Sequence, residues 1–520
     1  MFNSRSIDTA QTNIARKPSW FKIFSPYKKL HQLLTAKFLI LLTVSAYSQS
    51  NLTQEIDNAL AENCLNKRET SIRVIALPSG KELYTNNIHE PLLPASVMKL
   101  ITTAAALHYL GPEYRFTTEF LYNGVRKSNV IQGDLVIRAG ADPRLITENL
   151  WIIASQIKAS GINEVTGDLV VDTHFFDESD KAPEWEEERS QRAYDAKLSA
   201  LVLNFNSIAI HLQPGSDAGD TLNAWLDPPL PYIELHNSAK TIRRGRTTVG
   251  AHRTETVPGN VKIQVRGNLP ISAREKVIYI NVDQPTRYAA ETFRALLLKA
   301  GVKIKGETKI VSTPVTAKLL YQHFSPPLSL ILKELNIYSN NLTAEQIVKT
   351  IAAERYGTPG THAEGLRLIE EFLRISGVNL QGVLITDGSG LSRKNRMTTV
   401  AITALLSSMY SRFDIGPDFM TAMHIMGTNG ILSKRLSSSP ARGKIRAKTG
   451  TLRGISTLAG YVASQDGKIF AYALFFNNNR CGHWNADRIE DRIITAIYNY
   501  GDHAFEYESR VTRNLSELVD

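Results

Sequence analysis

The spacing of apolar residues changes between helical and strand-like periods along this chain of 520 residues. Residues 51–65 have the pattern of a helix. Ser71–Leu77 and Glu82–Tyr84 alternate on either side of a Pro-Ser-Gly turn, which predicts a hairpin. A long apolar run then follows Pro94, a residue type common at helix starts, and it ends near Gly111. This region therefore predicts a helix, a hairpin and a buried helix.

The middle of the chain has a different pattern. From Arg115 to about Asp177, short strand-like segments are separated by Gly and Asn, and Ser207–Leu212 alternates clearly where a β-rich stretch begins. Tyr288–Ala300 has the period of an amphipathic helix, and the insert ends near Thr313. We therefore expect a strand-rich insert between two parts of another domain.

The C-terminal part returns to mixed elements. Ser456–Val462 and Lys468–Phe476 flank Asp466-Gly467, a dipeptide typical of hairpin turns, and Trp484–Tyr500 reads as a closing helix. Strands and helices mixed in this way predict the α/β (α+β) class.

Composition is that of an ordinary globular protein, with 43% hydrophobic and 21% charged residues, and the length suggests about three domains. The net charge of +10 is uneven, because residues 1–50 contain seven Lys or Arg and one acid and so hold +6 of it. The remaining +4 gives no reason to expect a nucleic-acid partner.

The basic leading segment resembles a secretory signal peptide, expected at residues 1–48. The apolar run Phe38–Val44 follows Lys37, and Ala46-Tyr47-Ser48 offers the small residues that a signal peptidase requires. The run is short for a bilayer span, and an uncleaved anchor is the alternative. The prediction is a periplasmic protein, secreted across the inner membrane, with peripheral membrane association left open.

The cysteines and the search for metal-binding motifs give little information about function. Cys64 and Cys481 are the only cysteines; an oxidising compartment would permit a disulfide, but sequence alone cannot show that they are close. The chain has no HExxH metal motif and no GxSxG nucleophile elbow. We expect no metal and no cofactor.

Three short polar motifs carry the chemistry: Ser96-Val97-Met98-Lys99, Ser339-Asn340-Asn341 and Lys448-Thr449-Gly450. They match, in order, the SxxK, SxN and KTG set of serine enzymes that attack D-alanyl peptides and β-lactams. SxxK alone proves little, since Ser25–Lys28 and Ser155–Lys158 also fit it. Taken one at a time, the motifs could be a helix cap, an Asn-rich turn and a strand lysine without a catalytic role. Their occurrence together in this order favours catalysis.

The first two motifs suit nucleophilic catalysis. Ser96 and Lys99 share one face of a helix, and an apolar site favours the neutral lysine that can act as a base for serine. Ser339 can relay a proton, and Asn341 can hydrogen-bond both the lysine and a substrate amide.

The third motif suits substrate binding. Lys448 supplies positive charge and Thr449 a hydroxyl for a substrate carboxylate. Gly450, on an expected strand, leaves room for the substrate backbone to approach.

With these motifs the chain resembles the class C, low-molecular-mass penicillin-binding proteins, the D-alanyl-D-alanine carboxypeptidase/endopeptidase group. The resemblance implies a penicillin-binding transpeptidase-like catalytic domain, with an antiparallel sheet flanked by helices, plus inserted β-rich domains. Ala141 stands where the family often has Gly. Further segments match the family at Asp387–Arg393 (DGSGLSR), Gly133–Val136, Gly140–Leu145, Gly167–Asp172 and Asn204–Asn206.

Motif spacing agrees with inserts, because Ser96 and Ser339 are 243 positions apart, far more than in a β-lactamase of the same superfamily. The motifs all fall outside the insert, so we expect it to be dispensable for Ser96 chemistry and important for positioning polymer. The expected division is 49–114 for the first part of the catalytic domain, 115–204 and 284–313 for domain II, 205–283 for a nested β-rich domain III, and 314–520 for the rest of the catalytic domain.

The resemblance implies an acyl-enzyme mechanism on peptidoglycan stem peptides, with β-lactam antibiotics as covalent inhibitors. Ser96 would attack the carbonyl between two D-alanines, and the N–H groups of Ser96 and Thr451 would form the oxyanion hole. Arg393 matches the family arginine that faces the diamino acid of the stem. Asp172 is either the matching acid or an ordinary loop carboxylate.

Two alternatives share the fold. A β-lactamase-like hydrolase would turn over penicillin quickly, and a catalytically idle wall-binding scaffold would have lost the nucleophile chemistry. The long insert argues against the first and the intact motifs against the second. A cluster of arginines in the insert reads as either a solvated loop or a contact with anionic wall polymer: Arg243, Arg244, Arg246 and Arg253.

Overall fold

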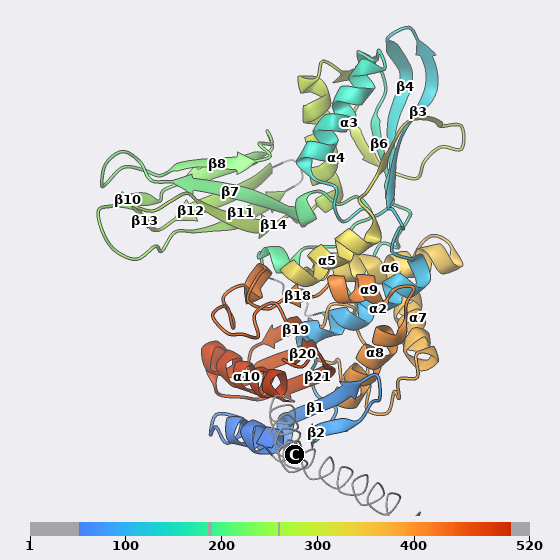
Figure 1. Ribbon diagram of the computed structural model, residues 1–520. Helices are drawn as coiled ribbons and strands as arrows, with labels where there is room; N and C mark the ends of the chain where they lie inside the picture. The colour runs from blue at the N-terminus through green and yellow to red at the C-terminus, as the bar shows by residue number, and fades with distance from the viewer. Residues whose placement is uncertain (1–50, 186–189, 258–259, 501–520) are drawn as a thin grey trace, which may run out of the picture.

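The structure is a computed structural model that describes residues 51–185, 190–257 and 260–500. The expected signal peptide, residues 1–48, and the spare SxxK match that begins at Ser25 both lie outside the described residues. Figure 1 shows a sheet with helices at the bottom, a second sheet with helices at the top, and a β-rich lobe at the side. This arrangement confirms the expected α/β (α+β) class.

The lower part is built on a six-stranded antiparallel sheet in the order β18-β19-β20-β21-β1-β2. The predicted hairpins near both ends of the chain are confirmed as β1–β2 and β20–β21. Strand β1 pairs with β21 so that Thr70 lies opposite Phe476. The strands are β1 (Thr70–Leu77), β2 (Glu82–Asn86), β18 (His424–Ile425), β19 (Ile445–Leu452), β20 (Ile455–Ala463) and β21 (Ile469–Phe476).

Both faces of this sheet are covered, which explains why β21 is apolar throughout. Phe470 and Tyr472 face the core formed with α10 (Gly482–Asn499) and the helix at 51–60, whereas Ala471 and Ala473 face the opposite core. The helices of that second side include α2 and α8, and Figure 1 shows this helical layer above the sheet. They are α2 (Met98–Leu110), α5 (Leu328–Tyr338), α6 (Asn341–Tyr356), α7 (His362–Ile375), α8 (Thr399–Ser411) and α9 (Gly416–Thr421).

The upper part is a seven-stranded sheet packed with two helices, α3 (Thr147–Ala159) and α4 (Pro285–Lys299). Helix α4 was predicted; α3 was not, because only strands were expected between Arg115 and Asp177. The spare SxxK match Ser155–Lys158 lies on α3, where Ser155 Oγ donates to the Trp151 carbonyl. The strands are β3 (Thr117–Lys127), β4 (Val130–Arg138), β5 (Glu164–Val165), β6 (Leu169–Asp172), β15 (Lys303–Ile304), β16 (Thr308–Ile310) and β17 (Lys318–Phe324).

The expected return to the catalytic domain at residue 314 is too early. Strand β17 pairs antiparallel with β3, so residues 318–324 belong to the upper sheet. The chain crosses to the lower part just afterwards, where Ser325 Oγ accepts a hydrogen bond from Phe116 N at 3.0 Å.

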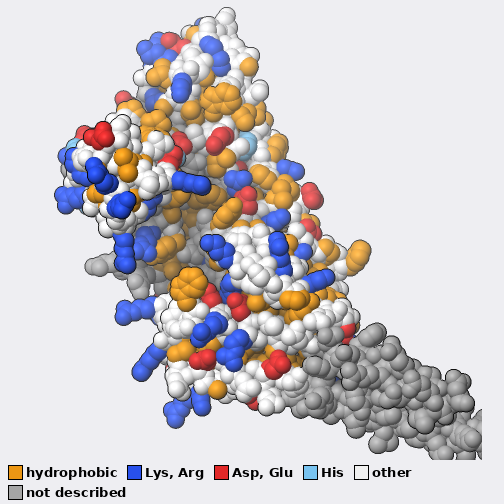
Figure 2. Space-filling view, turned by 60° about the vertical axis from the view of Figure 1, so that its left-hand side comes forward, with side chains coloured by type: hydrophobic (Ala, Val, Ile, Leu, Met, Phe, Trp, Pro, Cys, Tyr) orange, Lys and Arg blue, Asp and Glu red, His pale blue; other side chains and the backbone are white. Residues whose placement is uncertain are grey.

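The β-rich lobe is nested within the upper part and consists of three small sheets. Figure 2 shows that the surface is hollowed between this lobe and the body of the molecule, with hydrophobic side chains inside the hollow. The strands are β7 (Ser207–Gln213), β8 (Asn223–Asp227), β9 (Ile233–Asn237), β10 (Lys240–Ile242), β11 (Gly250–Val257), β12 (Asn260–Arg266), β13 (Asn268–Pro270) and β14 (Lys276–Asn281). Short 3-10 helices also occur along the described parts of the chain: η2 (Lys67–Glu69), η3 (Ala95–Val97), η4 (Ala193–Asp195), η5 (Asn204–Asn206) and η6 (Gly430–Leu432).

The arginines of the lobe divide into two groups. Arg243, Arg244 and Arg246 are exposed in the loop after β10, as expected of a solvated loop. Arg253 instead lies largely buried on β11 and forms an ion pair with Asp283 at 2.8 Å, so its role is structural.

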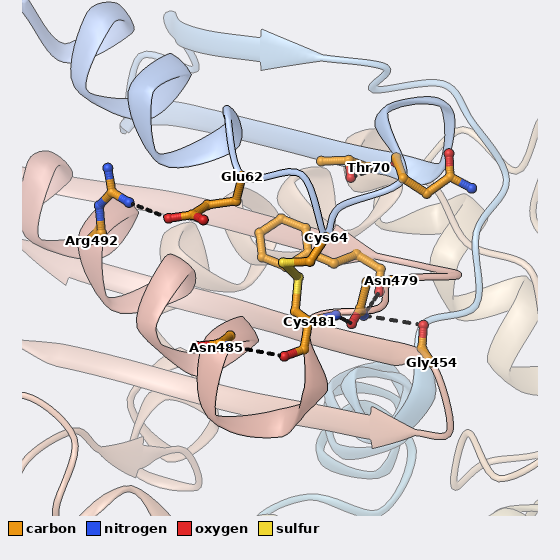
Figure 3. The surroundings of a disulfide bond; sticks show 10 residues. Glu62, Cys64, Thr70, Gly454, Asn479, Cys481, Asn485 and Arg492 are labelled. Carbon is orange, nitrogen blue, oxygen red and sulfur yellow. Dashed lines mark hydrogen bonds and ion pairs between the residues drawn. A yellow bond between two sulfur atoms is a disulfide. The ribbon is translucent and has the colours of Figure 1, made fainter.

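The two cysteines form a disulfide between segments 417 positions apart. Cys64 follows the helix at 51–60 and Cys481 precedes α10, as Figure 3 shows. Arg492 on α10 adds an ion pair with Glu62 at 3.1 Å. The pairing that the sequence left open is therefore formed, and it fixes the N-terminal helix beside α10. No helix within the described ranges has the length and apolarity needed to cross a membrane.

Candidate active site

Ser96 lies at a tight entry to α2. Ala95 has a positive φ of 45°, and Ser96 lies in the 3-10 turn η3 instead of the first turn of an α-helix opened by Pro94. Gly390 packs closely against this turn, and only a glycine fits there, because a Cβ would lie 1.8 Å from the Ala95 carbonyl oxygen. The backbone that presents the serine is thus held by close packing from a distant loop.

Lys99 is buried on the first turn of α2 and points at the serine. Its Nζ lies 3.0 Å from Ser96 Oγ, 2.7 Å from Asn341 Oδ1 and 2.6 Å from the Ser389 carbonyl oxygen. Burial lowers the pKa of Lys99 to about 8, although the nearby carboxylates Asp387 and Glu345 act in the opposite direction. Lys99 therefore loses its proton far more easily than an exposed lysine.

The SxN motif lies at the junction of α5 and α6. Ser339 ends α5 in the left-handed region with a φ of 53°, and Asn340 caps α6 by accepting from Thr343 N at 3.0 Å. Asn341 then begins α6, with its Oδ1 on Lys99. The turn places Ser339 Oγ 3.0 Å from Lys448 Nζ.

The KTG motif lies on β19, beside the serine. Lys448 is buried, and burial together with the charge of Lys99 lowers its pKa well below the usual value. Thr449 and Thr451 are accessible. Lys99 and Asn341 thus form one hydrogen-bonded pair beside the serine, and Ser339 and Lys448 form a second.

Gly450 also has a structural task, beside the one expected of it. A Cβ at Gly450 would lie 2.7 Å from Ser96 N and 2.3 Å from Thr457 Oγ1. The absence of a side chain lets β19 pack directly against the serine turn. Any larger residue would push the strand away from the nucleophile.

The DGSGLSR segment, Asp387–Arg393, is a scaffold for Lys99. Asp387 accepts hydrogen bonds from the N–H groups of Gly390 and Ser392, both at 2.7 Å. Glu345, buried on α6, accepts from Ser389 N at 2.8 Å and so fixes the residue whose carbonyl oxygen binds Lys99. Burial opposes ionisation of Glu345, but His362 and the N–H donors outweigh it and lower the pKa. Sequence analysis missed Glu345, which carries no motif of its own.

The insert also reaches the site. Asn341 Nδ2 donates to the Tyr194 carbonyl oxygen at 3.1 Å, and Trp185 Nε1 donates to Asp387 Oδ2 at 2.9 Å. Lys349 on α6 pairs with Asp177 of the insert at 2.6 Å. The contacts of Asn341 and Asp387 argue against an insert dispensable for Ser96 chemistry, because they orient the amide and the loop that hold Lys99.

The two predicted pocket residues lie in different surroundings. Arg393 is exposed, close to the KTG strand, and donates to the Arg453 carbonyl oxygen at 3.2 Å. Asp172 is buried at the end of β6, where its oxygens accept from His174 N at 2.9 Å and Thr313 N at 2.8 Å. Its pKa is lowered because these hydrogen bonds outweigh the effect of burial. The structure brings Arg393 toward the motifs, whereas the contacts of Asp172 stay within the insert.

The sheet between helices and the serine–lysine pair define a serine acyl-transfer enzyme of the penicillin-binding type. The chain belongs to the D-Ala-D-Ala carboxypeptidase 3 (S13) family, which it matches over residues 52–498. It is 32% identical to a D-alanyl-D-alanine carboxypeptidase of Actinomadura sp. (strain R39) over 478 residues, 89% of this chain and 87% of the relative. It is 26% identical to the D-alanyl-D-alanine carboxypeptidase DacB of Haemophilus influenzae over 496 residues, 92% of this chain and 100% of the relative.

The fold agrees with this family. The crystal structure of penicillin binding protein 4 (dacB) from Haemophilus influenzae superposes with a TM-score of 0.73 at 23% identity, covering 86% of this chain and 99% of that chain. The expected penicillin-binding transpeptidase-like architecture with inserted domains is therefore confirmed.

Proposed function

We propose that this protein hydrolyses the bond between two D-alanines in peptidoglycan stem peptides, through an acyl-enzyme on Ser96. The observation that carries the proposal is the position of Lys99 Nζ, 3.0 Å from Ser96 Oγ and buried with a pKa of about 8. A serine needs such a base within hydrogen-bond reach. The Actinomadura and Haemophilus relatives are both named D-alanyl-D-alanine carboxypeptidases, which is the same activity.

The reaction follows from this geometry. Ser96 Oγ forms a bond to the scissile carbonyl carbon as its proton passes to Lys99 Nζ, and the N–H groups of Ser96 and Thr451 bind the oxyanion. The intermediate then breaks its C–N bond. Lys99 gives back the proton that it took, and Ser339, whose Oγ lies 3.0 Å from Lys448 Nζ, relays that proton to the departing amine. Water hydrolyses the ester, which frees Ser96.

The same parts serve two kinds of substrate. A terminal D-alanine as leaving group makes the enzyme a carboxypeptidase, and a D-alanyl cross-link to a neighbouring stem makes it a DD-endopeptidase. Lys448 and Thr449 bind the terminal carboxylate, and Arg393 faces the diamino acid of the stem. Asp172 is the ordinary structural carboxylate of the two alternatives, because His174 N and Thr313 N engage both of its oxygens. β-Lactams acylate Ser96 in place of the peptide.

Location completes the proposal. The enzyme acts in the periplasm after removal of residues 1–48, with peripheral association to the membrane. The insert, from 115 to the end of β17, forms domain II, with the β-rich domain III nested inside it.

Labelling with fluorescent penicillin tests the nucleophile. Ser96→Ala should lose labelling and D-alanine release to background while it keeps the circular dichroism of the folded protein. Ser155→Ala is the matched control, because Ser155–Lys158 has the same SxxK pattern on α3. Labelling that survives in folded Ser96→Ala, or disappears in Ser155→Ala, would place the nucleophile elsewhere. Slow loss of the label from the wild type separates this function from that of a β-lactamase.

A further inference from the structure

A large cavity lies between the insert and the catalytic domain, and the proposed reaction uses only the Ser339 and Asn341 side chains at its edge. Its volume is about 930 Å³, at the upper end of ligand pockets in proteins. The upper domain, the β-rich lobe and helix α5 all contribute to its lining. It corresponds to the hollow region of Figure 2, where hydrophobic side chains gather between the lobe and the body.

The cavity is continuous with the reaction centre. Ser339 and Asn341 form part of its wall, and Asn341 Oδ1 is the group that binds Lys99 at 2.7 Å. Tyr194, whose carbonyl oxygen holds the Asn341 amide, lines it as well. A molecule in the cavity is therefore next to the stem peptide that reacts at Ser96.

Aromatic rings dominate its exposed lining. Trp151 is 57% exposed, Tyr279 60% and Tyr338 73%, and they come from the upper domain, the lobe and α5. Large rings left open to water mark binding surfaces when they gather around one concavity. A flat ring packs against another flat apolar face, with its polar atom free for hydrogen bonds.

The charges of the cavity select the kind of ligand. Its charged lining has three acids, Glu148, Asp227 and Glu334, against Arg144. Arg144 is already paired with Glu334 at 2.7 Å, which leaves exposed carboxylates without a matching arginine. A second stem peptide, which carries carboxylates of its own, would be repelled. A neutral polyhydroxylated chain would not be repelled.

We propose that this cavity binds the glycan chain to which the reacting stem peptide is attached, a neutral polymer of N-acetylated amino sugars. The sugar rings stack on Trp151 and Tyr279, and their hydroxyl and acetamido groups bond to the polar lining. The inference rests on the proposed function for the identity of the polymer, and it gives the insert a task in substrate selection.

The test compares D-alanine release from a disaccharide-linked pentapeptide and from the same pentapeptide without sugars. The disaccharide should raise kcat/KM about tenfold, equivalent to about 1.4 kcal/mol. Trp151→Ala and Tyr279→Ala should each bring this ratio toward one. Penicillin acylation on the same samples verifies a folded site. Trp484→Ala, 87% exposed on α10 and outside the cavity lining, should keep the ratio of the wild type.

A second measurement does not depend on catalysis. A tetrasaccharide of N-acetylglucosamine, which has the N-acetylated sugar rings and no carboxylate, should quench tryptophan fluorescence when titrated into the full-length protein, and Trp151→Ala should abolish the effect. A wild-type ratio of one, a ratio kept in both variants, or a variant defect seen instead on sugar-free cross-linked peptide would each overturn the glycan site. Failure of the proposed function has a different signature, namely no D-alanine release from either substrate.

Discussion

Lys99 is subject to two opposing influences, and their balance sets the working pH. Burial favours the neutral amine, while Asp387 and Glu345 favour the ammonium, and the resulting pKa is about 8. Only the neutral form can take the proton of Ser96. Acylation should therefore be slow when Lys99 is protonated, below pH 8, and should rise to a plateau above it.

The charge of Glu345 gives a direct test of this balance. Glu345→Gln removes a negative charge near Lys99, so the pKa of Lys99 should fall and the acid limb of the acylation profile should move to lower pH by roughly one unit. The measurement is the second-order rate constant for penicillin acylation against pH. Glu354→Gln, on the same helix but bound to Tyr114, is the matched control and should not move the limb. An unmoved limb in Glu345→Gln, or a shift to higher pH, would contradict the assignment of Lys99 as base.

Among the elements, the segment between β6 and β7 connects the insert to the active site. Trp185 is buried there, and its indole donates to Asp387, the carboxyl group at the centre of the DGSGLSR loop. Hydrogen bonds to charged groups contribute about 1.5–3 kcal/mol. Loss of this hydrogen bond should therefore lower the stability of the fold and also disturb the geometry around Lys99.

Trp185→Phe isolates that hydrogen bond, because it removes the N–H and keeps most of the ring. The free energy of unfolding in urea should fall by about 1.5–3 kcal/mol, and penicillin acylation should slow. Trp484→Phe, an exposed tryptophan on α10, should change neither. If Trp185→Phe lost stability but acylated at the wild-type rate, the segment would be structural only.

Local patterns explain which elements the sequence could predict. The β20–β21 hairpin, α10 and α4 each have a clear period and a turn or break at their ends. Helix α3 was missed although Leu150, Ile153 and Ile157 form an apolar stripe, since exposed Trp151 and Ile152 blur its period. Those exposed apolar residues are unusual for a helix surface, and Trp151 lines the cavity.

The residues of the active site also fall into those that a local sequence pattern could predict and those that it could not. The three motifs could be recognised because each is contiguous in sequence. Glu345, Trp185 and the Tyr194 carbonyl reach the surroundings of Lys99 through contacts across 43 or more positions, such as Glu345 to Gly388 and Ser389, so no local pattern marks them. Because these long-range contacts leave no local pattern, the sequence suggested an insert that Ser96 chemistry does not need. The contact of Asn341 with Tyr194 of the insert argues against that prediction.

At the scale of the molecule, the disulfide between Cys64 and Cys481 closes a loop of 417 positions and holds the N-terminal helix to α10. Removing a native disulfide commonly costs about 2–5 kcal/mol, in part because the unfolded chain gains freedom. The Cys64→Ser/Cys481→Ser double variant should therefore melt at a lower temperature. Ser96 lies in a different core, and the folded variant should still label with penicillin at 25 °C.

Reductant provides the control for this experiment. Because the chain has no other cysteine, dithiothreitol should lower the melting temperature of the wild type and leave the double variant unaffected. Equal melting temperatures of the oxidised wild type and the variant would show that packing of α10 alone holds the N-terminal helix.

The pairing of β1 with β21 has a further consequence, for the order in which the protein assembles. Thr70 meets Phe476, and the nucleophile must wait for SxN and KTG segments that lie hundreds of positions later. Contacts so distant in sequence form slowly. Under the proposed secretion with the N-terminus first, the serine would leave the cytoplasm long before its partners. The enzyme would then be inert throughout export and would gain the ability to cut the wall only when its last strands had emerged.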